Sequence, residues 1–336
     1  MKLLIKQPIK IGNISINNRL VMPPMETRKA TPDGYVTDDI IHYYKERAKG
    51  SVIGIIITEH LYVSQEGKAV RGQLGISDDK YIEGLSQIAK AIKLNGPKAI
   101  AQISHAGSAA PASEVGEKNI IGPSAVINPA PTAREKHIPK ALTINNIDNL
   151  KNKFVIAALR SKQAGFDGVE LHSAHGYLLN QFYSPITNKR TDIFGCQSVE
   201  NRLRFTLDII HNIRKAVGND YLIGLRLGAI DYNMENGSTI EDVTIASKIL
   251  NESQLNFIDI SGGLNGISCG YTNEPGYFSD ASSIVKASSN LPVILTGGIR
   301  TIEQAETLIK NKKADLIGIG RPIFAKADWA YKAMNI

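Results

Sequence analysis

The most regular feature of the chain is a series of short apolar runs, rich in valine, isoleucine and leucine. Eight of these runs predict strands, at residues 19–24, 51–58, 98–104, 168–172, 221–227, 256–261, 292–298 and 315–321. Each run is of strand length and contains few polar residues, which is typical of parallel strands that are covered on both faces. The pattern therefore favours a sheet whose strands are joined by crossing segments.

Amphipathic segments lie between these runs. Apolar residues repeat at helical spacing within residues 38–50, 147–165, 198–218, 239–253 and 301–312. Asp38, Ser198 and Thr301 are predicted N-caps, and Gly50 and Gly218 are predicted helix ends. Strands that alternate with helices in this way indicate a (β/α)8 TIM barrel, with a doubly wound sheet as the alternative.

One connection is much longer than the others. The segment from His105 to Asn145 follows the third predicted strand and is rich in Pro, Gly, Ala and Ser. Loops of this length inside a compact domain usually carry function or small elements of their own. We therefore expect a lid-like insertion with a short hairpin over the barrel mouth, within a single domain that spans residues 1–336.

Composition changes this picture little. The 336 residues are 43% hydrophobic and 21% charged, with a formal net charge of +7, as in ordinary globular proteins. Lysines and arginines are scattered without a basic run, so we expect a solvated surface and no nucleic-acid partner. The longest apolar run, from Val52, is too short to span a membrane, and the N-terminus is a poor signal peptide. Cys196 and Cys269 form no CxxC motif, so zinc and iron–sulfur frameworks are unsupported and a cytoplasmic protein is predicted.

Polar residues and glycines gather where the predicted strands end, and that end of a barrel carries the active site. They are Glu26, Glu59, His60, Gln102, His172, His175, Tyr177, Arg226, Ser261, Gly297, Gly298, Gly320 and Arg321. Taken alone, Gln102 could be a satisfied core amide, and Arg226 could be an ion-pair partner. Their convergence at eight strand ends indicates a binding site.

The last two strand ends indicate the type of ligand. Gly297 and Gly298 precede a helix, and Gly320 and Arg321 follow the eighth strand. In such barrels these two loops often bind phosphate, because glycine lets the backbone approach and arginine adds a charge-assisted hydrogen bond. A plain turn with a helix cap is the alternative. No G-x-G-x-x-G motif opens a βαβ unit, so we expect the phosphorylated ligand to lie across the barrel mouth.

Between about Pro8 and Trp329 the chain contains, in order, "NRLVMPPM", "AQISHAG", "GPSA", "GFDGVELHSAHGYLLNQFYSPITNKRTDIFG", "ENRLRF", "ISGG", "TGGIR" and "ADLIGIGRP". Together these segments resemble the Old Yellow Enzyme family of FMN-dependent ene-reductases, in its shorter, single-domain bacterial form. The resemblance implies one FMN-binding barrel in which NADH or NADPH reduces the flavin. The flavin then passes hydride to the β-carbon of a small α,β-unsaturated carbonyl compound.

The resemblance also implies roles for individual residues. It places Pro23, Pro24, Met25 and Glu26 on one side of the flavin, His60 at a backbone contact, Gln102 at the pyrimidine edge, Arg226 near N1 and O2, and Gly298, Gly320 and Arg321 at the phosphate. His172 and His175 match the pair that binds the substrate carbonyl, and Tyr177 matches the proton donor. Two N–H donors would form an oxyanion hole for the enolate, and the phenol would protonate the α-carbon. A metal site at the two histidines lacks a third ligand, and Tyr177 could instead be a packing ring.

Two positions depart from the family pattern. Glu26 stands where the family usually has Thr or Cys. We expect it either to be protonated in the flavin complex, with its pKa raised by burial, or to be neutralised by Arg28. Arg28 replaces a substrate-contacting tyrosine, which favours acidic or carboxylated substrates unless this arginine is solvated or paired with Glu26. The family's C-terminal arginine from a neighbouring subunit has no counterpart after Arg321, so association into a homo-oligomer is left open.

Other function classes fit the residues less well. An RNA-modifying flavoprotein of the dihydrouridine synthase type suits the net charge, but it needs a cysteine where the loop reads "SHAGSAAP". A flavin-free lyase or aldolase would need a Schiff-base lysine at a strand end, and none of the predicted ends supplies one. We therefore predict an NAD(P)H-dependent flavin oxidoreductase, with the RNA-modifying flavoprotein as the alternative.

Overall fold

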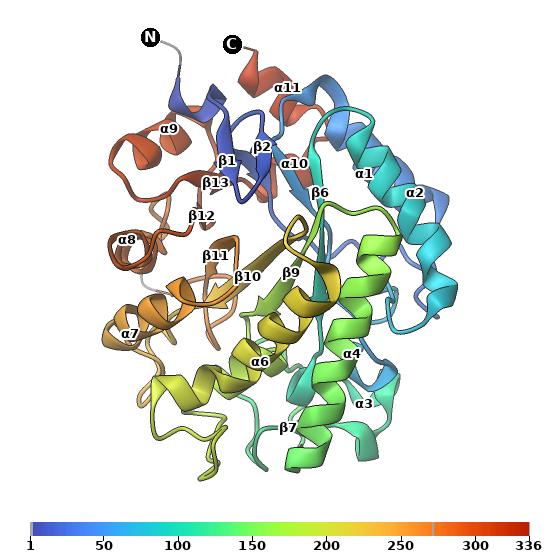
Figure 1. Ribbon diagram of the computed structural model, residues 1–336, viewed down its shortest axis with the longest axis vertical. Helices are drawn as coiled ribbons and strands as arrows, with labels where there is room; N and C mark the ends of the chain where they lie inside the picture. Colours follow the sequence, from blue (N-terminus) through green and yellow to red (C-terminus); the bar gives the residue numbers. More distant parts are fainter. Residues whose placement is uncertain (1–2, 271, 336) are drawn as a thin grey trace.

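The computed structural model describes residues 3–270 and 272–335, and its centre is a closed ring of eight parallel strands (Figure 1). In sequence order they are β3 (Leu20–Met22), β4 (Ile55–Ile57), β6 (Lys98–Ser104), β9 (Gly168–Ser173), β10 (Leu222–Gly228), β11 (Phe257–Ser261), β12 (Val293–Leu295) and β13 (Leu316–Gly318). Neighbouring strands pair in parallel, and the β3–β13 and β4–β6 pairings close the ring. The predicted (β/α)8 barrel is confirmed, each predicted run overlaps one barrel strand, and the doubly wound alternative is wrong.

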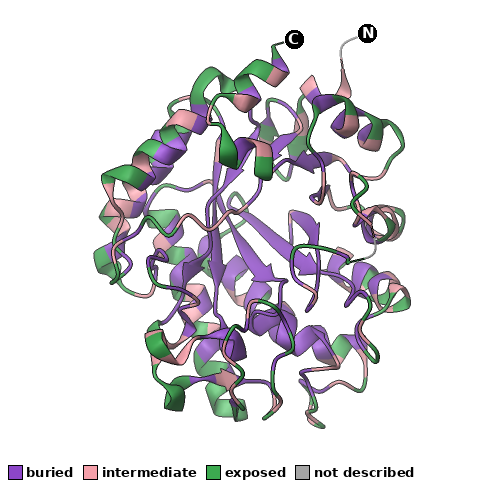
Figure 2. Ribbon diagram, turned by 180° about the vertical axis from the view of Figure 1, so that it is seen from behind, coloured by how far each residue is buried: buried purple, intermediate pink, exposed green. Residues whose placement is uncertain are grey.

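Helices surround the ring, and Figure 2 shows their exposed outer faces around a buried set of strands. The five predicted helices are α1 (Asp38–Ala48), α4 (Ile144–Gln163), α6 (Val199–Val217), α7 (Ile240–Asn251) and α9 (Ile302–Lys310). The prediction missed α2 (Ile82–Lys93), α3 (Ala112–Val115), α5 (Leu178–Tyr183), α8 (Ser279–Ser288), α10 (Arg321–Ala325) and α11 (Trp329–Met334). In α2 the helical spacing of Leu85, Ile88 and Ile92 is a signal that could have found it. Among the described residues, no helix is long and apolar enough to cross a membrane.

The helix caps follow the sequence closely. The side chain of Ser198 accepts a hydrogen bond from the backbone N–H of Asn201, and Thr301 accepts one from Gln304, so both predicted N-caps are confirmed. Asp38 is not an N-cap, because Thr37 holds that position and Asp38 is the first residue of α1. Its carboxylate there still suits the positive end of the helix dipole.

Apolar side chains close the N-terminal end of the barrel. A hairpin that the sequence did not predict, β1 (Ile9–Ile11) and β2 (Ile14–Ile16), places Ile11 and Ile16 against the first interior residues of the strands. Phe257 fills much of this space, and a Cβ at position 224 would lie 2.1 Å from its ring, so Gly224 makes the packing possible. The interior is therefore sealed at this end, and polar chemistry is confined to the opposite end.

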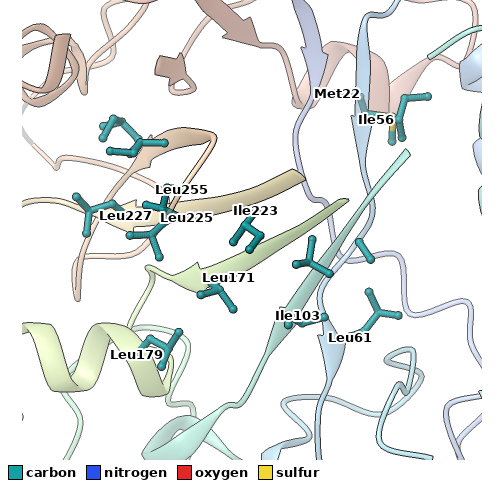
Figure 3. Close-up of a cluster of buried hydrophobic side chains, with 14 of the residues drawn as sticks. Met22, Ile56, Leu61, Ile103, Leu171, Leu179, Ile223, Leu225, Leu227 and Leu255 are labelled. Carbon is teal, nitrogen blue, oxygen red and sulfur yellow. The ribbon is translucent and has the colours of Figure 1, made fainter. Parts of the chain in front are cut away.

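The two faces of each strand carry different residues. Leu171 and Leu225 are register partners on β9 and β10 and belong to the large apolar cluster that includes helix residues (Figure 3). Because side chains alternate along a strand, Glu170, His172 and Arg226 face the barrel interior instead. The outward face thus holds the helices, while the inward face brings charged groups together.

The insertion after β6 differs from the prediction in one respect. Its two short strands, β7 (Ile121–Gly122) and β8 (Lys140–Ala141), pair in parallel, so they do not form the expected hairpin. A parallel pair requires the intervening chain to run back along the strands, and this connection packs at the barrel mouth. There the Thr132 hydroxyl donates to the His175 carbonyl at 2.6 Å, and the Asn128 side chain donates to the Gly176 carbonyl at 2.9 Å.

Candidate active site

Four rings form a buried cluster at the C-terminal ends of the strands. The ring centroids of His172 and His175 are 5.2 Å apart, and Tyr177 lies 4.9 Å from His172. His60, which follows β4, completes the cluster at 5.1 Å from Tyr177 and 5.7 Å from His172. None of the four side chains is more than 8% exposed. The structure therefore brings together the predicted substrate-binding and proton-donating residues.

A tight turn after β9 produces this arrangement. His175 and Gly176 both have positive φ, 58° and 76°, so the chain reverses direction within two residues. The backbone N–H of His175 donates to the Gly262 carbonyl at 3.1 Å, which ties the turn to the end of β11. Tyr177 then precedes α5, and its ring points back to the histidines. Three side chains from one short segment thus face one space.

Burial sets the protonation of these rings. It lowers the pKa of His172 and of His175 well below the ordinary value, and the nearby Arg226 and His60 add to the effect, together with His175 in the case of His172. Both imidazoles are therefore neutral near pH 7, and each offers one N–H donor. Burial raises the pKa of Tyr177, so its hydroxyl keeps its proton. Among the described residues the Nδ1 atom of His172 is buried and has no hydrogen-bond partner.

A charged layer lies inside the barrel at the same strand ends. The Nε atom of Arg226 is 3.2 Å from the Oδ2 atom of Asp259, and its Nη2 atom is 3.5 Å from the hydroxyl of Ser261. Gln102 donates through Nε2 to Glu170 at 2.8 Å. Neither Glu170 nor Asp259 was among the residues predicted for the site. Each is one charged residue within an apolar predicted strand, and that contrast is the signal that could have found them.

The loop after β3 determines the state of Glu26. Its Oε1 atom is 2.6 Å from Nε of Arg28, and its Oε2 atom is 3.6 Å from Nε2 of His60. Burial opposes ionisation of Glu26, but its hydrogen bonds and electrostatic interactions with His60 and Arg28 outweigh this effect and lower the pKa of Glu26 to about 2. Protonation of Glu26 in the flavin complex stays a prediction, and the contact with Arg28 supports the alternative, neutralisation by this arginine.

Two hollows with shared walls open at this end of the barrel. The first, of about 210 Å³, is lined by Pro23, Pro24, Met25, Arg226, Ser261, Ile267, Ser268, Asn273, Tyr277, Phe278, Thr296, Gly297, Gly298, Ile299, Gly318, Gly320 and Arg321. The second, of about 380 Å³, is lined by Glu26, Ala69, Val70, Pro131, Thr132, Arg134, Tyr177, Asn265, Gly266, Ile267 and Ser268. Of the predicted site residues, those that line the first hollow are Pro23, Pro24, Met25, Arg226, Gly298, Gly320 and Arg321, and those that line the second are Glu26 and Tyr177. Five predicted residues line neither hollow: Arg28, His60, Gln102, His172 and His175. A larger hollow, of about 630 Å³, lies between the insertion and α4, away from the strand ends.

The residues of the first hollow fit FMN. Gly297 and Gly298 have φ values of 115° and 72°, and a Cβ at position 298 would come within 3.0 Å of the Glu274 carbonyl. Glycine at these positions would let a phosphate approach the backbone N–H groups, and Arg321 adds a cation at the same hollow. Arg226 also lines the hollow, and its positive charge would favour a reduced, anionic flavin. Pro23 and Met25 supply apolar surface for a planar ring.

Metal chemistry has no comparable support. Within residues 3–270 and 272–335, no three His, Cys, Asp or Glu side chains are grouped so that they could hold a metal ion. His172 and His175 are instead part of the ring cluster, and a hydrogen bond joins His175 to Ser261. The ring cluster is thus built from imidazoles and one phenol, with Arg226 beside it.

Comparison with known proteins gives one consistent result. A sequence model of the NADH:flavin oxidoreductase / NADH oxidase family matches residues 5–335. The chain is 41% identical over 330 residues to NADH oxidase of Thermoanaerobacter brockii, covering 96% of this chain and 50% of that protein. It is 34% identical to metal reductase of Desulforamulus reducens, covering 98% of this chain and 48% of that protein. The chain spans about half the length of these curated relatives.

Solved structures agree on the fold. A 2-naphthoyl-CoA reductase in complex with 2-naphthoyl-CoA superposes with a TM-score of 0.90 at 29% identity, over 99% of this chain and 52% of that one. An old yellow enzyme homologue from Zymomonas mobilis superposes with a TM-score of 0.84 at 27% identity, over 98% of this chain and 91% of that one.

Proposed function

The chain belongs to the NADH:flavin oxidoreductase / NADH oxidase family, and from that premise we propose that it is an FMN-dependent ene-reductase. FMN as cofactor and a reduced nicotinamide as reductant, both predicted from the sequence, are the chemistry of this family. The substrate would be a small α,β-unsaturated carbonyl compound, reduced at its β-carbon. The observation that carries this proposal is the buried cluster of neutral His172, neutral His175 and protonated Tyr177, of which Tyr177 lines the second hollow.

The first hollow would hold the flavin. Pro23 and Met25 would pack on one face of the ring, Gln102 would bond the pyrimidine edge, and Arg226 would lie near N1 and O2. Gly298, Gly320 and Arg321 would hold the phosphate. When bound, FMN accepts hydride from the nicotinamide and delivers it to the substrate. The protein's own contribution is to orient the substrate and to manage charge and protons.

His172 and His175 would bind the carbonyl oxygen of the substrate. Addition of hydride at the β-carbon converts that oxygen into the oxyanion of an enolate, so N–H donors held in place gain strength as the reaction proceeds. Neutral imidazoles suit this role, because Arg226 already places a positive charge nearby. Burial and that charge both oppose a second cation on His172 or His175. Their burial also excludes water, which would otherwise compete for the oxygen.

Tyr177 would then give its proton to the α-carbon. Its pKa is raised by burial, so the hydroxyl holds its proton across the physiological pH range and can act as a general acid. Tyr177 lines the second hollow together with Glu26 and Arg134. This hollow would receive the remainder of the substrate. A phenolate left after proton transfer must be reprotonated from solvent, and the open side of that hollow offers a route.

Several finer expectations stay predictions. Arg28 as a substrate contact would have to act while its Nε atom remains bonded to Glu26. We likewise propose a preference for an acidic substrate, a single-domain organisation, formation of a homo-oligomer and a cytoplasmic location.

One anaerobic experiment tests the proposed function. The purified protein, supplied with FMN, should be yellow, lose its flavin absorbance on addition of NADH or NADPH, and regain it when cyclohexenone is added. Excluding air matters, because oxygen would reoxidise the flavin and hide the second step. A protein that binds no FMN, or a reduced flavin that cyclohexenone leaves colourless while air restores it, would contradict the ene-reductase proposal.

A further inference from the structure

Two carboxyl groups and one guanidinium share the barrel interior below the mouth. Glu170 lies on β9, Arg226 on the neighbouring β10, and Asp259 on β11, the next strand. Both carboxyl side chains are 0% exposed, and Arg226 is 6% exposed. Arg226 forms its ion pair with Asp259, at 3.2 Å. Among the described residues, no cation lies within ion-pair distance of Glu170. One of the two acids therefore has no partner for its charge.

Glu170 has one hydrogen bond, and it joins a residue of the proposed flavin site. Gln102 on β6 donates through Nε2 to Oε1 of Glu170 at 2.8 Å. The Oε2 atom of Glu170 is buried and has no hydrogen-bond partner among the residues the structure describes. A buried, ionised carboxylate that accepts a single hydrogen bond is energetically costly. A neutral carboxyl group that carries its proton on Oε2 avoids most of that cost.

We propose that Glu170 is a positioning residue, which stays protonated beneath the barrel mouth and fixes the carboxamide of Gln102 for the pyrimidine edge of the flavin. The bond to Oε1 uses one N–H of Gln102 and defines which way its amide faces, so the carbonyl oxygen and second N–H are presented together. This inference rests on the proposed function for the identity of the ligand. The protonation of Glu170 can be tested without it.

The surrounding charges agree with a neutral Glu170. Burial raises the pKa of Glu170 well above its ordinary value, and the negative charge of Asp259 raises it further, while Arg226 and the bond from Gln102 act in the opposite direction. His172, two residues along β9, is neutral and contributes no charge. With Glu170 protonated, Arg226 and Asp259 balance each other, and negative charge that develops on the flavin meets no uncompensated anion.

A matched pair of isosteric variants identifies which acid carries the charge. Glu170→Gln imitates the protonated carboxyl group, so the midpoint potential of the FMN-loaded protein at pH 7 should stay near that of the wild type. Asp259→Asn removes the counterion of Arg226 and should raise the potential, because uncompensated positive charge favours the reduced, anionic flavin. If Glu170→Gln raises the potential as much as Asp259→Asn does, Glu170 is ionised and the proposal is overturned.

A third variant tests the positioning role. Glu170→Leu removes the acceptor and leaves a buried N–H of Gln102 unsatisfied, so affinity for FMN should fall roughly tenfold. Glu170→Gln keeps an acceptor at the same place and should bind FMN within about twofold of the wild type. A merely structural role would make these two changes alike, and equal FMN affinity in the leucine variant and the wild type would refute the positioning role.

Infrared spectroscopy of the wild type decides the protonation state even if a variant fails to fold. A protonated carboxyl group has a carbonyl stretching band that a carboxylate lacks. Burial raises the pKa of Glu59 to about 7, despite hydrogen bonds from Thr27, so its band should fade by about pH 9 while that of Glu170 persists. Absence of any such band at that pH overturns the proposal. Failure to bind FMN would instead contradict the proposed function, and the infrared measurement would still report the protonation state of Glu170.

Discussion

The Nε2 atom of His175 lies 2.7 Å from the hydroxyl oxygen of Ser261, and the same oxygen lies 3.5 Å from Nη2 of Arg226. Arginine can only donate, so the Ser261 oxygen accepts from Arg226 and can turn its own hydrogen toward His175. In that arrangement the neutral imidazole of His175 carries its proton on Nδ1. One hydroxyl thus links the cation of the proposed flavin site to a predicted substrate donor.

Ser261→Ala should therefore weaken the reaction with enone. Loss of the hydroxyl frees the His175 ring to rotate and to change tautomer, and kcat/KM for cyclohexenone should fall about fivefold to tenfold, the value of one hydrogen bond. Ser261→Thr keeps the hydroxyl and should recover most of the rate. Steady-state kinetics of the two variants make the comparison, and an equal loss in both would assign the effect to packing.

Tyr177→Phe should separate the two half-reactions. Without the phenol proton, reoxidation of the reduced flavin by enone should slow by about 10²-fold to 10⁴-fold, the usual contribution of a positioned acid. Reduction by NADPH needs no such proton and should change little. Anaerobic stopped-flow measurement of each step provides the readout. Similar losses in both steps would mean that Tyr177 acts by shaping the pocket.

Glu26→Gln should raise the flavin midpoint potential without changing its pH slope between about pH 5 and pH 8. The pKa of Glu26 is lowered to about 2, so the carboxylate is ionised throughout this range and does not titrate in it. Removing its charge makes reduction easier. Arg28→Gln is the matched control and should lower the potential by removing the partner cation. A change of slope in Glu26→Gln would show that FMN binding protonates this carboxyl group.

Arg321→Gln should discriminate between FMN and riboflavin. If the arginine holds the phosphate, FMN affinity should fall roughly tenfold to a hundredfold, the range for a hydrogen bond to a charged group. Riboflavin lacks the phosphate, and its affinity should be unchanged. Fluorescence titration of both flavins gives the two constants. Parallel losses for both ligands would place Arg321 at the ring or in the fold, away from the phosphate.

Glu59→Gln should change how stability depends on pH. Burial raises the pKa of Glu59 from 4.5 to about 7, and hydrogen bonds from Thr27 only partly offset this. Between these values the folded protein binds the proton that the unfolded chain releases, so wild-type stability falls as pH rises through the window and this contribution is constant above it. The variant lacks this fall and should be more stable than the wild type at pH 8, by about 3 kcal/mol. Denaturant unfolding at both ends of this pH window measures the stability difference between the two proteins. If their stability depends on pH in the same way, the prediction is refuted.

Local patterns in the sequence were sufficient for much of this architecture. Apolar runs at 168–172 and 221–227 predicted strands, and Ser198 and Thr301 were correctly identified as caps, because period and capping depend on residues a few positions apart. The segment that carries His172, His175 and Tyr177 was likewise recognisable, since all three lie within six residues of one another.

Tertiary structure decided what depends on distant neighbours. Whether Glu26 is ionised is determined by Arg28 together with His60, and the second of these comes from another strand end. Arg226 pairs with Asp259, and Glu170 accepts a hydrogen bond from Gln102; the strand order of the sheet decides which of these residues are neighbours. The parallel pairing of β7 and β8 and the hairpin beneath the barrel were also beyond the local pattern. Local patterns in the chain specified the barrel strands, five of the helices and the strand ends where polar groups collect. The closed ring specified which charges meet, because Coulomb energy and desolvation depend on distance in space and not on separation in sequence.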